Sequence, residues 1–102
     1  MMQLNKNNFK KEVKSGPAAI DCYADWCGPC RVLSPMFEQI SKEVKGIKFY
    51  KLDVDENPEI SSEYSIMSIP NILFLKDGKE VDRMIGLTSK EELKSKIEKT
   101  LK

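Results

Sequence analysis

The chain contains no histidine, and only three of its 102 residues are cysteine. A structural zinc ion takes about four cysteine or histidine ligands, so a zinc site within one chain is not expected. Three cysteines also do not form the evenly paired disulfide framework of a small secreted protein. We therefore predict no metal site, and this cysteine usage is typical of a reducing compartment such as the cytoplasm.

Long apolar runs and an excess of charge are also missing. No segment approaches the roughly 20 apolar residues that a helix needs to cross a bilayer. Met1–Lys6 lacks the basic-then-apolar pattern of an export leader. The 17 basic and 16 acidic residues are interleaved and give a net charge of +1. This balance argues against nucleic acid or a membrane as the main partner, and we expect a cytoplasmic monomer.

The residues that are present suffice for one folded unit. A chain of 102 residues that is 40% apolar can build a hydrophobic core without stabilising disulfides or metal ions. Because no repeat, low-complexity tract or linker interrupts it, we expect a single domain over residues 1–102.

Helix-type and strand-type apolar patterns alternate along the chain. A short additional strand near Gln3-Leu4 is an option before the first helix. The pattern predicts, in order, a short helix containing Phe9 and Val13, a strand over Ala18–Ala24, a helix from Pro29 that Gly46 ends, a strand over Ile47–Val54, a short helix over Pro58–Tyr64, strands over Ile72–Leu75 and Val81–Ile85, and a final helix carrying Leu93, Ile97 and Leu101.

Two local signals support this order. Asp77-Gly78 between apolar runs is typical of a hairpin with a type I′ turn, which needs positive φ at both central residues. Ser89 followed by Glu92 predicts a capping box at the start of the last helix. Strand–helix–strand units require parallel pairing, and the hairpin adds an antiparallel edge. We predict an α/β fold with a central mixed β-sheet and helices on both faces.

The segment Trp26-Cys27-Gly28-Pro29-Cys30 follows the predicted buried strand and opens the long helix. Two intervening residues at a helix start place both sulfurs on one side. The free N–H groups and the dipole of the helix favour a thiolate at Cys27, which we predict to be the nucleophile. Cys30, one turn further and less exposed, would then be the resolving thiol. A structural disulfide, a buried thiol pair and a metal shared between two chains are the alternatives.

Asp21 lies within the apolar strand that precedes the two cysteines. Cys30 must lose and regain a proton, and without histidine the group that exchanges it must be a thiol or a perturbed carboxyl. Burial disfavours the charged carboxylate, so we expect the pKa of Asp21 to be raised towards neutrality. The alternative is a strand acid whose side chain reaches the sheet edge and water.

Several features at matching spacings make the chain resemble the thioredoxin family. WCGPC is that family's active-site signature, and the resemblance extends from about Leu4 to Leu101. It includes Asp21 five residues before the tryptophan, the later Ile69-Pro70, the Asp-Gly hairpin and a glycine before the last helix. The resemblance implies the thioredoxin fold and a protein thiol–disulfide oxidoreductase that needs no cofactor beyond its own disulfide. It also implies disulfide-containing client proteins and a separate electron donor of the thioredoxin reductase type.

The resemblance further assigns roles to individual residues. It makes Asp21 a general acid and base for Cys30, directly or through water, and it places Lys51 near that carboxylate, where an ordinary surface lysine is the alternative. It makes the Ile69–Pro70 bond cis and leaves the Ile69 backbone free to pair with substrate. Gly86 could instead serve turn geometry alone. The residues implied around the sulfurs are Trp26, Gly28, Pro29, Val54, Ser68, Ile69, Pro70, Ile85, Gly86 and Leu87.

The chain departs from the family pattern at several positions. Tyr23 stands where the family usually has a second tryptophan or another aromatic residue. Met67-Ser68 stands where a basic residue and glycine, or similar pairs, are common, and Asn71 stands where threonine is usual. These changes alter the rim of the groove and so affect partner choice. Cys22 is an extra cysteine, which we interpret as a small buried filler; a regulatory or dimer-forming thiol is the alternative.

Two other functions compete with disulfide reduction. The same chemistry run backwards would make the chain a thiol oxidase or isomerase, but oxidising relatives commonly carry a histidine between the cysteines. Gly28-Pro29 offers no such charge, so we predict a reductant. A binding module in which the dithiol is incidental is the second alternative.

Overall fold

The computed structural model describes residues 1–102, and its centre is a five-stranded sheet in the order β1-β3-β2-β4-β5. β2 pairs parallel with β3 and antiparallel with β4, and β5 adds a second antiparallel pair. The predicted mixed sheet is confirmed. The elements are β1 (Met2–Gln3), α1 (Phe9–Val13), β2 (Pro17–Tyr23), α2 (Gly28–Glu43), β3 (Lys48–Asp53), α3 (Pro58–Glu63), β4 (Asn71–Lys76), β5 (Lys79–Ile85) and α4 (Lys90–Leu101).

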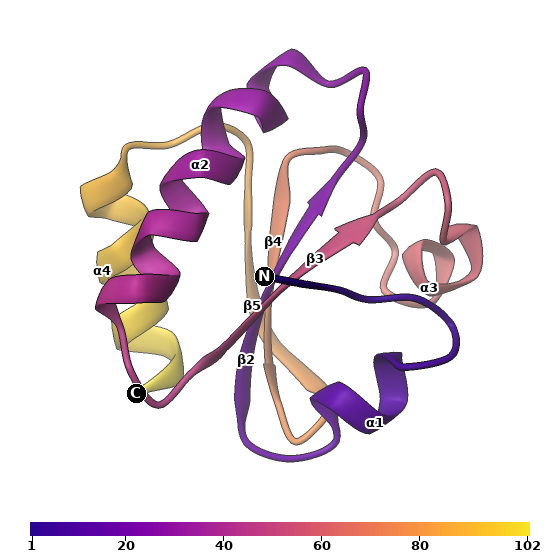
Figure 1. The fold of residues 1–102 in the computed structure, drawn as a ribbon, viewed down its shortest axis with the longest axis horizontal. Helices are drawn as coiled ribbons and strands as arrows, with labels where there is room; N and C mark the ends of the chain where they lie inside the picture. The colour runs from indigo at the N-terminus through magenta and orange to yellow at the C-terminus, as the bar shows by residue number, and fades with distance from the viewer.

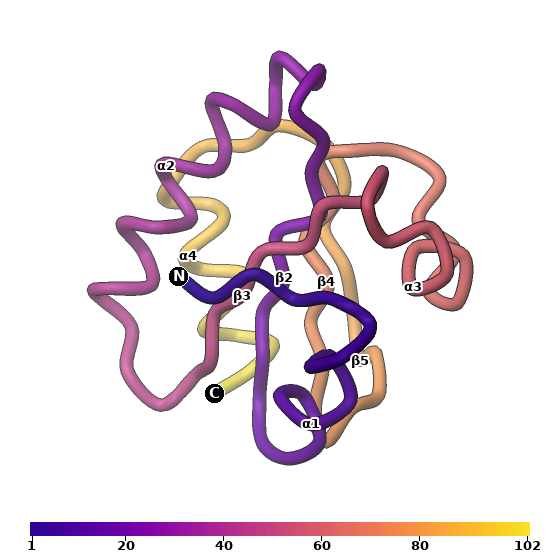
Figure 2. Tube along the Cα trace, turned by 45° about the vertical axis from the view of Figure 1, so that its right-hand side comes forward, coloured from indigo at the N-terminus to yellow at the C-terminus, as the bar shows by residue number.

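Helices cover both faces of the sheet, as predicted. α2 and α4 lie together on one face, and α1 and α3 lie on the other (Figure 1). The turned view of Figure 2 keeps the same two pairs apart on either side of the strands. None of the helices is long and apolar enough to cross a membrane.

Successive side chains of β2 point to opposite faces of the sheet and pack into two separate cores. Ile20 and Cys22 pack with Phe9 of α1 and Ile60 of α3. Ala19, one residue earlier, joins the other core with residues of α2 and α4. Asp21 shares the parity of Ala19, so its side chain enters the α2 side of the sheet, in a position that otherwise takes apolar residues. The largest fully buried side chains of that second core are Leu33, Phe37, Ile40, Ile72, Phe74, Leu93 and Ile97.

The predicted element ends differ from the observed ones by up to two residues. The long helix stops at Glu43 rather than just before Gly46, because Val44 already has an extended backbone. β5 begins at Lys79 rather than Val81, since the ladder continues to the Lys76–Lys79 pair beside the turn. Those two lysines are polar, so an apolar pattern does not detect their pairing.

The hairpin turn is confirmed, and of the predicted capping box the Ser89 half forms, while the Glu92 carboxylate accepts from the Thr88 hydroxyl instead of the Ser89 N–H. Asp77 and Gly78 have φ values of 53° and 81°, as a type I′ turn requires. Ser89 caps α4 through a side-chain oxygen that accepts from the backbone N–H of Glu92 at 3.1 Å. Figure 1 shows the hairpin turn between β4 and β5 at the end of the sheet opposite the start of α2.

Candidate active site

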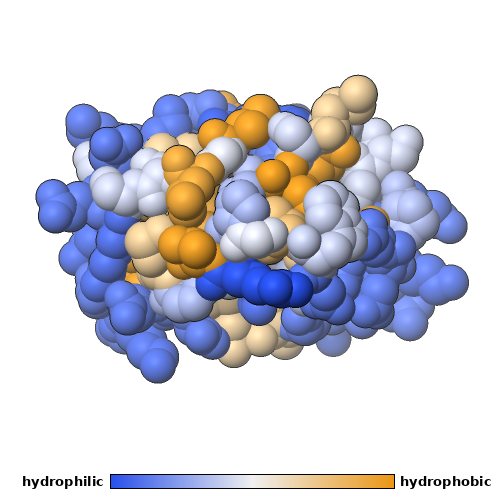
Figure 3. Space-filling model, turned by 90° about the horizontal axis from the view of Figure 1, so that it is seen from above, coloured by the Kyte–Doolittle hydropathy of each residue, from blue (hydrophilic) through white to orange (hydrophobic).

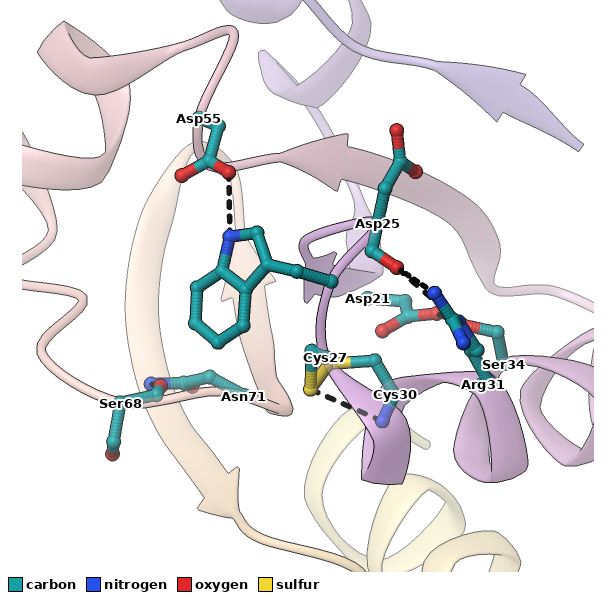
Figure 4. Close-up of a disulfide and its surroundings, with 10 residues drawn as sticks. Asp21, Asp25, Cys27, Cys30, Arg31, Ser34, Asp55, Ser68 and Asn71 are labelled. Carbon is teal, nitrogen blue, oxygen red and sulfur yellow. Dashed lines mark hydrogen bonds between the residues drawn. A yellow bond between two sulfur atoms is a disulfide. The ribbon is translucent and has the colours of Figure 1, made fainter.

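The two cysteines lie where β2 leads into α2. Cys27 is the N-cap of the helix, and its Sγ accepts a hydrogen bond from the backbone N–H of Cys30 at 3.2 Å. The two residues form a disulfide with their Cα atoms 5.3 Å apart (Figure 4). Cys27 is 4% exposed and Cys30 is 2% exposed, so the expected difference in exposure has the right direction but is small.

The start of α2 favours negative charge on Cys27. The first N–H groups of a helix have no partner within the helix, and the helix dipole is positive at this end. The Cys30 N–H already points at the Cys27 sulfur, and Pro29 in the first turn has no N–H to contribute. When the disulfide is reduced, the same N–H is available to a thiolate at Cys27.

Asp21 is fully buried behind the disulfide, on the side of α2 (Figure 4). Its Oδ2 accepts a hydrogen bond of 2.6 Å from the Ser34 hydroxyl, while its Oδ1 has no partner. Burial raises the pKa of Asp21, and the Ser34 hydrogen bond and the Lys51 charge only partly oppose that rise. The direction predicted from the sequence is confirmed, and the alternative of a carboxylate that reaches water is wrong.

Lys51 lies on β3 directly opposite Asp21 in the strand register. The lysine forms no ion pair with that carboxylate; its Nζ lies 4.6 Å from the centroid of the Tyr23 ring. The ring of Tyr23 thus holds the ammonium by a cation–π contact. Lys51 is partly buried, and its positive charge lowers the pKa of Asp21 against the effect of burial.

Lys51, Cys30 and Ser34 line the same cavity, which has a volume of about 180 Å³. Its lining joins the end of β2 and the first turns of α2 to β3. A larger cavity of about 680 Å³ lies between the N-terminal segment and α3, and no cysteine lines it. The small cavity is the one next to the sulfur chemistry. Its complete lining is Tyr23, Ala24, Asp25, Cys30, Arg31, Ser34 and Lys51.

The segment before β4 packs beside the disulfide. The Ile69–Pro70 peptide bond is cis, and Ile69 and Val54 pack against the cluster that contains both cysteines. The carbonyl of Pro70 accepts from the N–H of Gly86 at 2.8 Å, so Gly86 lies beside this proline. Gly86 has a φ of 91°, which favours glycine, so a turn requirement also acts there. The backbone N–H and C=O of Ile69 make no hydrogen bond within the chain.

Exposed apolar side chains surround this end of the sheet. Trp26 is 68% exposed, and Met67, in the segment before β4, is 91% exposed. Ile85 and Leu87 follow at the end of β5 and are also exposed. We call Trp26, Met67, Ile85 and Leu87 the apolar rim. Seen from above, this end of the molecule has apolar atoms across its centre and hydrophilic atoms around them (Figure 3).

Comparison with known proteins agrees with this geometry. The family model described as thioredoxin matches residues 1–99. The chain belongs to the thioredoxin family. It is 47% identical over 98 residues to a thioredoxin of Rickettsia felis, which covers 93% of both chains. It is 40% identical over 96 residues to one of Chlamydia trachomatis, with 94% of both chains covered. A thioredoxin of Staphylococcus saprophyticus is 38% identical over 102 residues, with 99% of this chain and 98% of the relative covered.

Membership in the thioredoxin family assigns the activity. Together with the Cys27–Cys30 disulfide, it makes the chain a thiol–disulfide oxidoreductase that reduces protein disulfides. Proteins of the thioredoxin family work through this disulfide without a separate cofactor. The fold and the activity that the resemblance implied are therefore confirmed.

The positions that depart from the thioredoxin pattern have distinct environments. The Tyr23 hydroxyl accepts from Nε2 of Gln3 at 2.6 Å. Asn71 is buried with an unpaired Oδ1, and its Nδ2 donates to the Ser68 carbonyl at 3.4 Å. Cys22 is buried in the core on the α1 and α3 side, as a small filler would be. Burial raises the pKa of its thiol strongly and so disfavours the thiolate, the reactive form.

Three contacts of the site were not predicted, those of Ser34 with Asp21, Trp26 with Asp55 and Arg31 with Asp25. Ser34 follows Cys30 by four residues on the same helix face, and this spacing could have pointed to it. Asp55 accepts a hydrogen bond of 2.7 Å from the Trp26 indole N–H, and Arg31 donates to the Asp25 carbonyl (Figure 4). Nothing in the sequence pattern indicates the Trp26–Asp55 pair, because the loop after β3 sets it.

Proposed function

We propose that Cys27 is the nucleophile and Cys30 the resolving thiol in the reduction of client disulfides. The observation that carries this assignment is the position of the Cys27 sulfur at the start of α2, where it accepts from the Cys30 N–H. A helix start stabilises a thiolate, and the thiolate is the form that attacks a disulfide.

The first step joins the chain to its client. The Cys27 thiolate attacks one sulfur of the client disulfide, the client S–S bond breaks, and a Cys27–client mixed disulfide forms. The departing client sulfur leaves as a thiolate and takes up a proton. The gain in reactivity comes from the helix start, so no metal or cofactor is needed for this step.

The second step releases the client. Cys30 gives its proton to the Asp21 carboxylate, and the Cys30 thiolate attacks the Cys27 sulfur. The Cys27–Cys30 disulfide forms, the mixed disulfide breaks, and the second client sulfur leaves and is protonated. Two electrons pass from the dithiol to the client. We assign Asp21 the general acid and base role, because it is buried behind the disulfide with one free oxygen.

Client proteins would bind over the groove beside the disulfide. The unpaired backbone of Ile69 can form hydrogen bonds with an extended client segment, as an added strand does. Trp26, Gly28, Pro29, the cis Pro70 and Gly86 would provide close, weakly selective contacts, and Lys51 would tune the charge near Asp21. The apolar rim supports this proposal, since exposed apolar groups on one face mark interaction sites.

The oxidised chain then needs an electron donor. We propose a separate donor of the thioredoxin reductase type, disulfide-containing client proteins as acceptors, and a cytoplasmic monomer as the working form. The near-neutral charge and the cysteine usage support these assignments. The absence of a charged residue between the cysteines supports reduction over oxidation.

Insulin reduction by dithiothreitol tests the proposal. We expect the wild-type chain to accelerate insulin precipitation, and Cys27→Ser to remove the acceleration entirely. Cys30→Ser should remove turnover while still forming a mixed disulfide. Cys22→Ala is the matched control and should keep full activity, because Cys22 is buried away from the site. A Cys27→Ser variant that still reduced insulin would refute the assignment.

Incubation with glutathione tests the direction of the chemistry. A reductant has a low potential, so its disulfide should persist in a glutathione buffer that reduces an oxidising relative. A Cys27–Cys30 disulfide that opened readily in a small excess of glutathione would favour the oxidase alternative.

A further inference from the structure

We infer that Ser34 is a positioning residue for the proton-transfer step, holding Oδ2 of Asp21 so that Oδ1 is left to exchange the proton with Cys30. The inference rests on the proposed acid and base role of Asp21 and adds a residue that the activity does not by itself assign. Three features of the structure carry it: the direction of the Ser34 hydroxyl, the unequal state of the two carboxyl oxygens, and the charges around them.

The Ser34 hydroxyl does not follow the usual behaviour of a serine within a helix. Such a hydroxyl commonly bonds back to a carbonyl three or four residues earlier or faces water. Ser41, on the same helix, does this and donates to the carbonyl of Glu38. Ser34 instead donates across to Oδ2 of Asp21 on β2, at 2.6 Å. Its hydroxyl therefore joins the helix that carries Cys30 to the strand that carries the acid.

The two oxygens of Asp21 are in different states. Oδ2 is held by Ser34, whereas Oδ1 is buried without any partner. Asp53, the other buried carboxylate, shows what a purely structural acid does: its Oδ1 accepts from the backbone N–H groups of Asp55 and Glu56. An unpaired buried oxygen destabilises the fold, so its presence in a native structure calls for an explanation, of which a catalytic role is one. At Asp21 the use that geometry allows is to take a proton.

Ser34 and Cys30 also lie on one side of α2 and border the same cavity, through which a proton could reach solvent. Residues four apart on a helix lie on the same face, so Ser34 follows Cys30 along the side of α2 that faces β2. Both line the small cavity that Lys51 reaches from β3. Figure 4 shows the Asp21 side chain between Ser34 and the disulfide.

The groups around Asp21 leave Ser34 as its one hydrogen-bond donor. Lys51 faces it from β3 without an ion pair, and Ile72, its register partner on β4, is apolar. The titratable and charged groups nearby are Cys22 and Tyr23 on β2, Asp25 in the following loop, Cys30 and Arg31 on α2, and Lys51 on β3.

Loss of the hydroxyl would change the acid in a defined direction. Ser34 stabilises the carboxylate, so its removal raises the pKa of Asp21 further. Fewer molecules then carry the carboxylate at a given pH below the midpoint, and Cys30 is deprotonated more slowly. The proton passes from Cys30 Sγ to Asp21 Oδ1, and the Ser34 hydrogen stays on its Oγ throughout.

Stopped-flow release of thionitrobenzoate isolates this step. Reduced protein is mixed with dithionitrobenzoate, which forms a Cys27–thionitrobenzoate mixed disulfide, and the attack of Cys30 then releases the second coloured thiolate. We expect Ser34→Ala to move the pH midpoint of this second phase upwards and to slow it about three- to tenfold below the midpoint. Ser34→Thr, which keeps the hydroxyl, should restore it, and Ser41→Ala should behave as wild type. Alanine suits a helix interior, so the variant should fold.

An Asp21→Asn background separates the two hypotheses. If Ser34 acts through Asp21, Ser34→Ala has no further effect on the second phase in that background. If the pH dependence of the second phase is unchanged in Ser34→Ala but disappears in Asp21→Asn, the role of Ser34 is overturned and the role of Asp21 is left intact. A profile unchanged in Asp21→Asn would overturn both.

Discussion

The two ends of the sheet differ in how well their polar groups are satisfied. At the end where α2 begins, the apolar rim is exposed to solvent, and the only two buried side-chain oxygens without partners lie on Asp21 and Asn71. At the opposite end, Gly16 and Asp77 bond to each other twice, at 2.7 and 3.1 Å. The Tyr64 hydroxyl donates to the Gly78 carbonyl there.

This difference indicates that the end with Cys27 and Cys30 serves the chemistry and that the end with the Asp77-Gly78 turn serves stability. The hairpin end follows the local rules of turn residues and paired polar groups, as segments without a chemical task do. The dithiol end breaks those rules with an unpaired buried acid and exposed apolar groups. Substitutions at the two ends should therefore have opposite consequences, with lost activity at one and lost stability at the other.

The largest effect is expected for Asp21→Asn on activity. An amide neither takes up nor releases the proton of Cys30, so insulin reduction should fall about 10- to 100-fold. The rate should be measured across a pH series. Asp82→Asn, which changes a partly exposed acid paired with Lys96, is the matched control and should leave the pH profile unchanged. If Asp21→Asn reduced insulin at the wild-type rate with the wild-type pH dependence, the proposed difference between the two ends of the sheet would be wrong.

The same substitution should stabilise the oxidised protein. Burial raises the pKa of Asp21 in the folded state, so the unfolded chain loses this proton at lower pH than the folded chain. Wild-type stability should therefore fall as pH rises from the unfolded pKa to the raised folded pKa. Asp21→Asn should remove that slope and gain about 1–3 kcal/mol above the transition. Urea unfolding at several pH values measures this, and equal slopes in the two proteins would contradict it.

Gly78→Ala should show the reverse behaviour at the hairpin end. Gly78 has a φ of 81°, so an alanine there should cost about 1–2 kcal/mol of unfolding free energy. The cost is conformational, because the added Cβ would lie 3.7 Å from the Val13 carbonyl oxygen, an ordinary contact. Lys79→Ala serves as the neighbouring control. Insulin reduction should be unaffected, and a loss of activity without a loss of stability would refute the separation.

Cys22→Ala should have the smallest effect. Cys22 adjoins Asp21 in the sequence but lies in the other core. Loss of its buried sulfur should cost about 1 kcal/mol and leave reduction unchanged. Denaturant unfolding and the insulin assay check both parts. A changed response to oxidants in this variant would favour a regulatory thiol.

Most of the fold could be predicted because periodicity and turn chemistry are local. The buried strand before the cysteines and the Asp77-Gly78 turn were predicted correctly. The start of β5 was missed because Lys79 pairs through its backbone and carries no apolar signal. The end of the long helix was misplaced because Val44, although buried, has an extended backbone.

The site was predictable where one residue type has one strong preference. A carboxylate within an apolar strand indicated a raised pKa for Asp21, and the cysteine spacing indicated the disulfide. The hydrogen bond of Ser34 to Asp21 and that of Trp26 to Asp55 depend on how separate elements pack. Such contacts between elements are set by the tertiary structure, and the sequence carries at most a spacing hint for Ser34.

The most direct test of the central claim is to locate the bond between this chain and a client. Cys30→Ser should be mixed with insulin, and the adduct should be mapped by peptide mass spectrometry. We expect an insulin cysteine joined to Cys27 by a disulfide, and no adduct with the Cys27→Ser, Cys30→Ser protein. An adduct at Cys22, or none at Cys27, would contradict it.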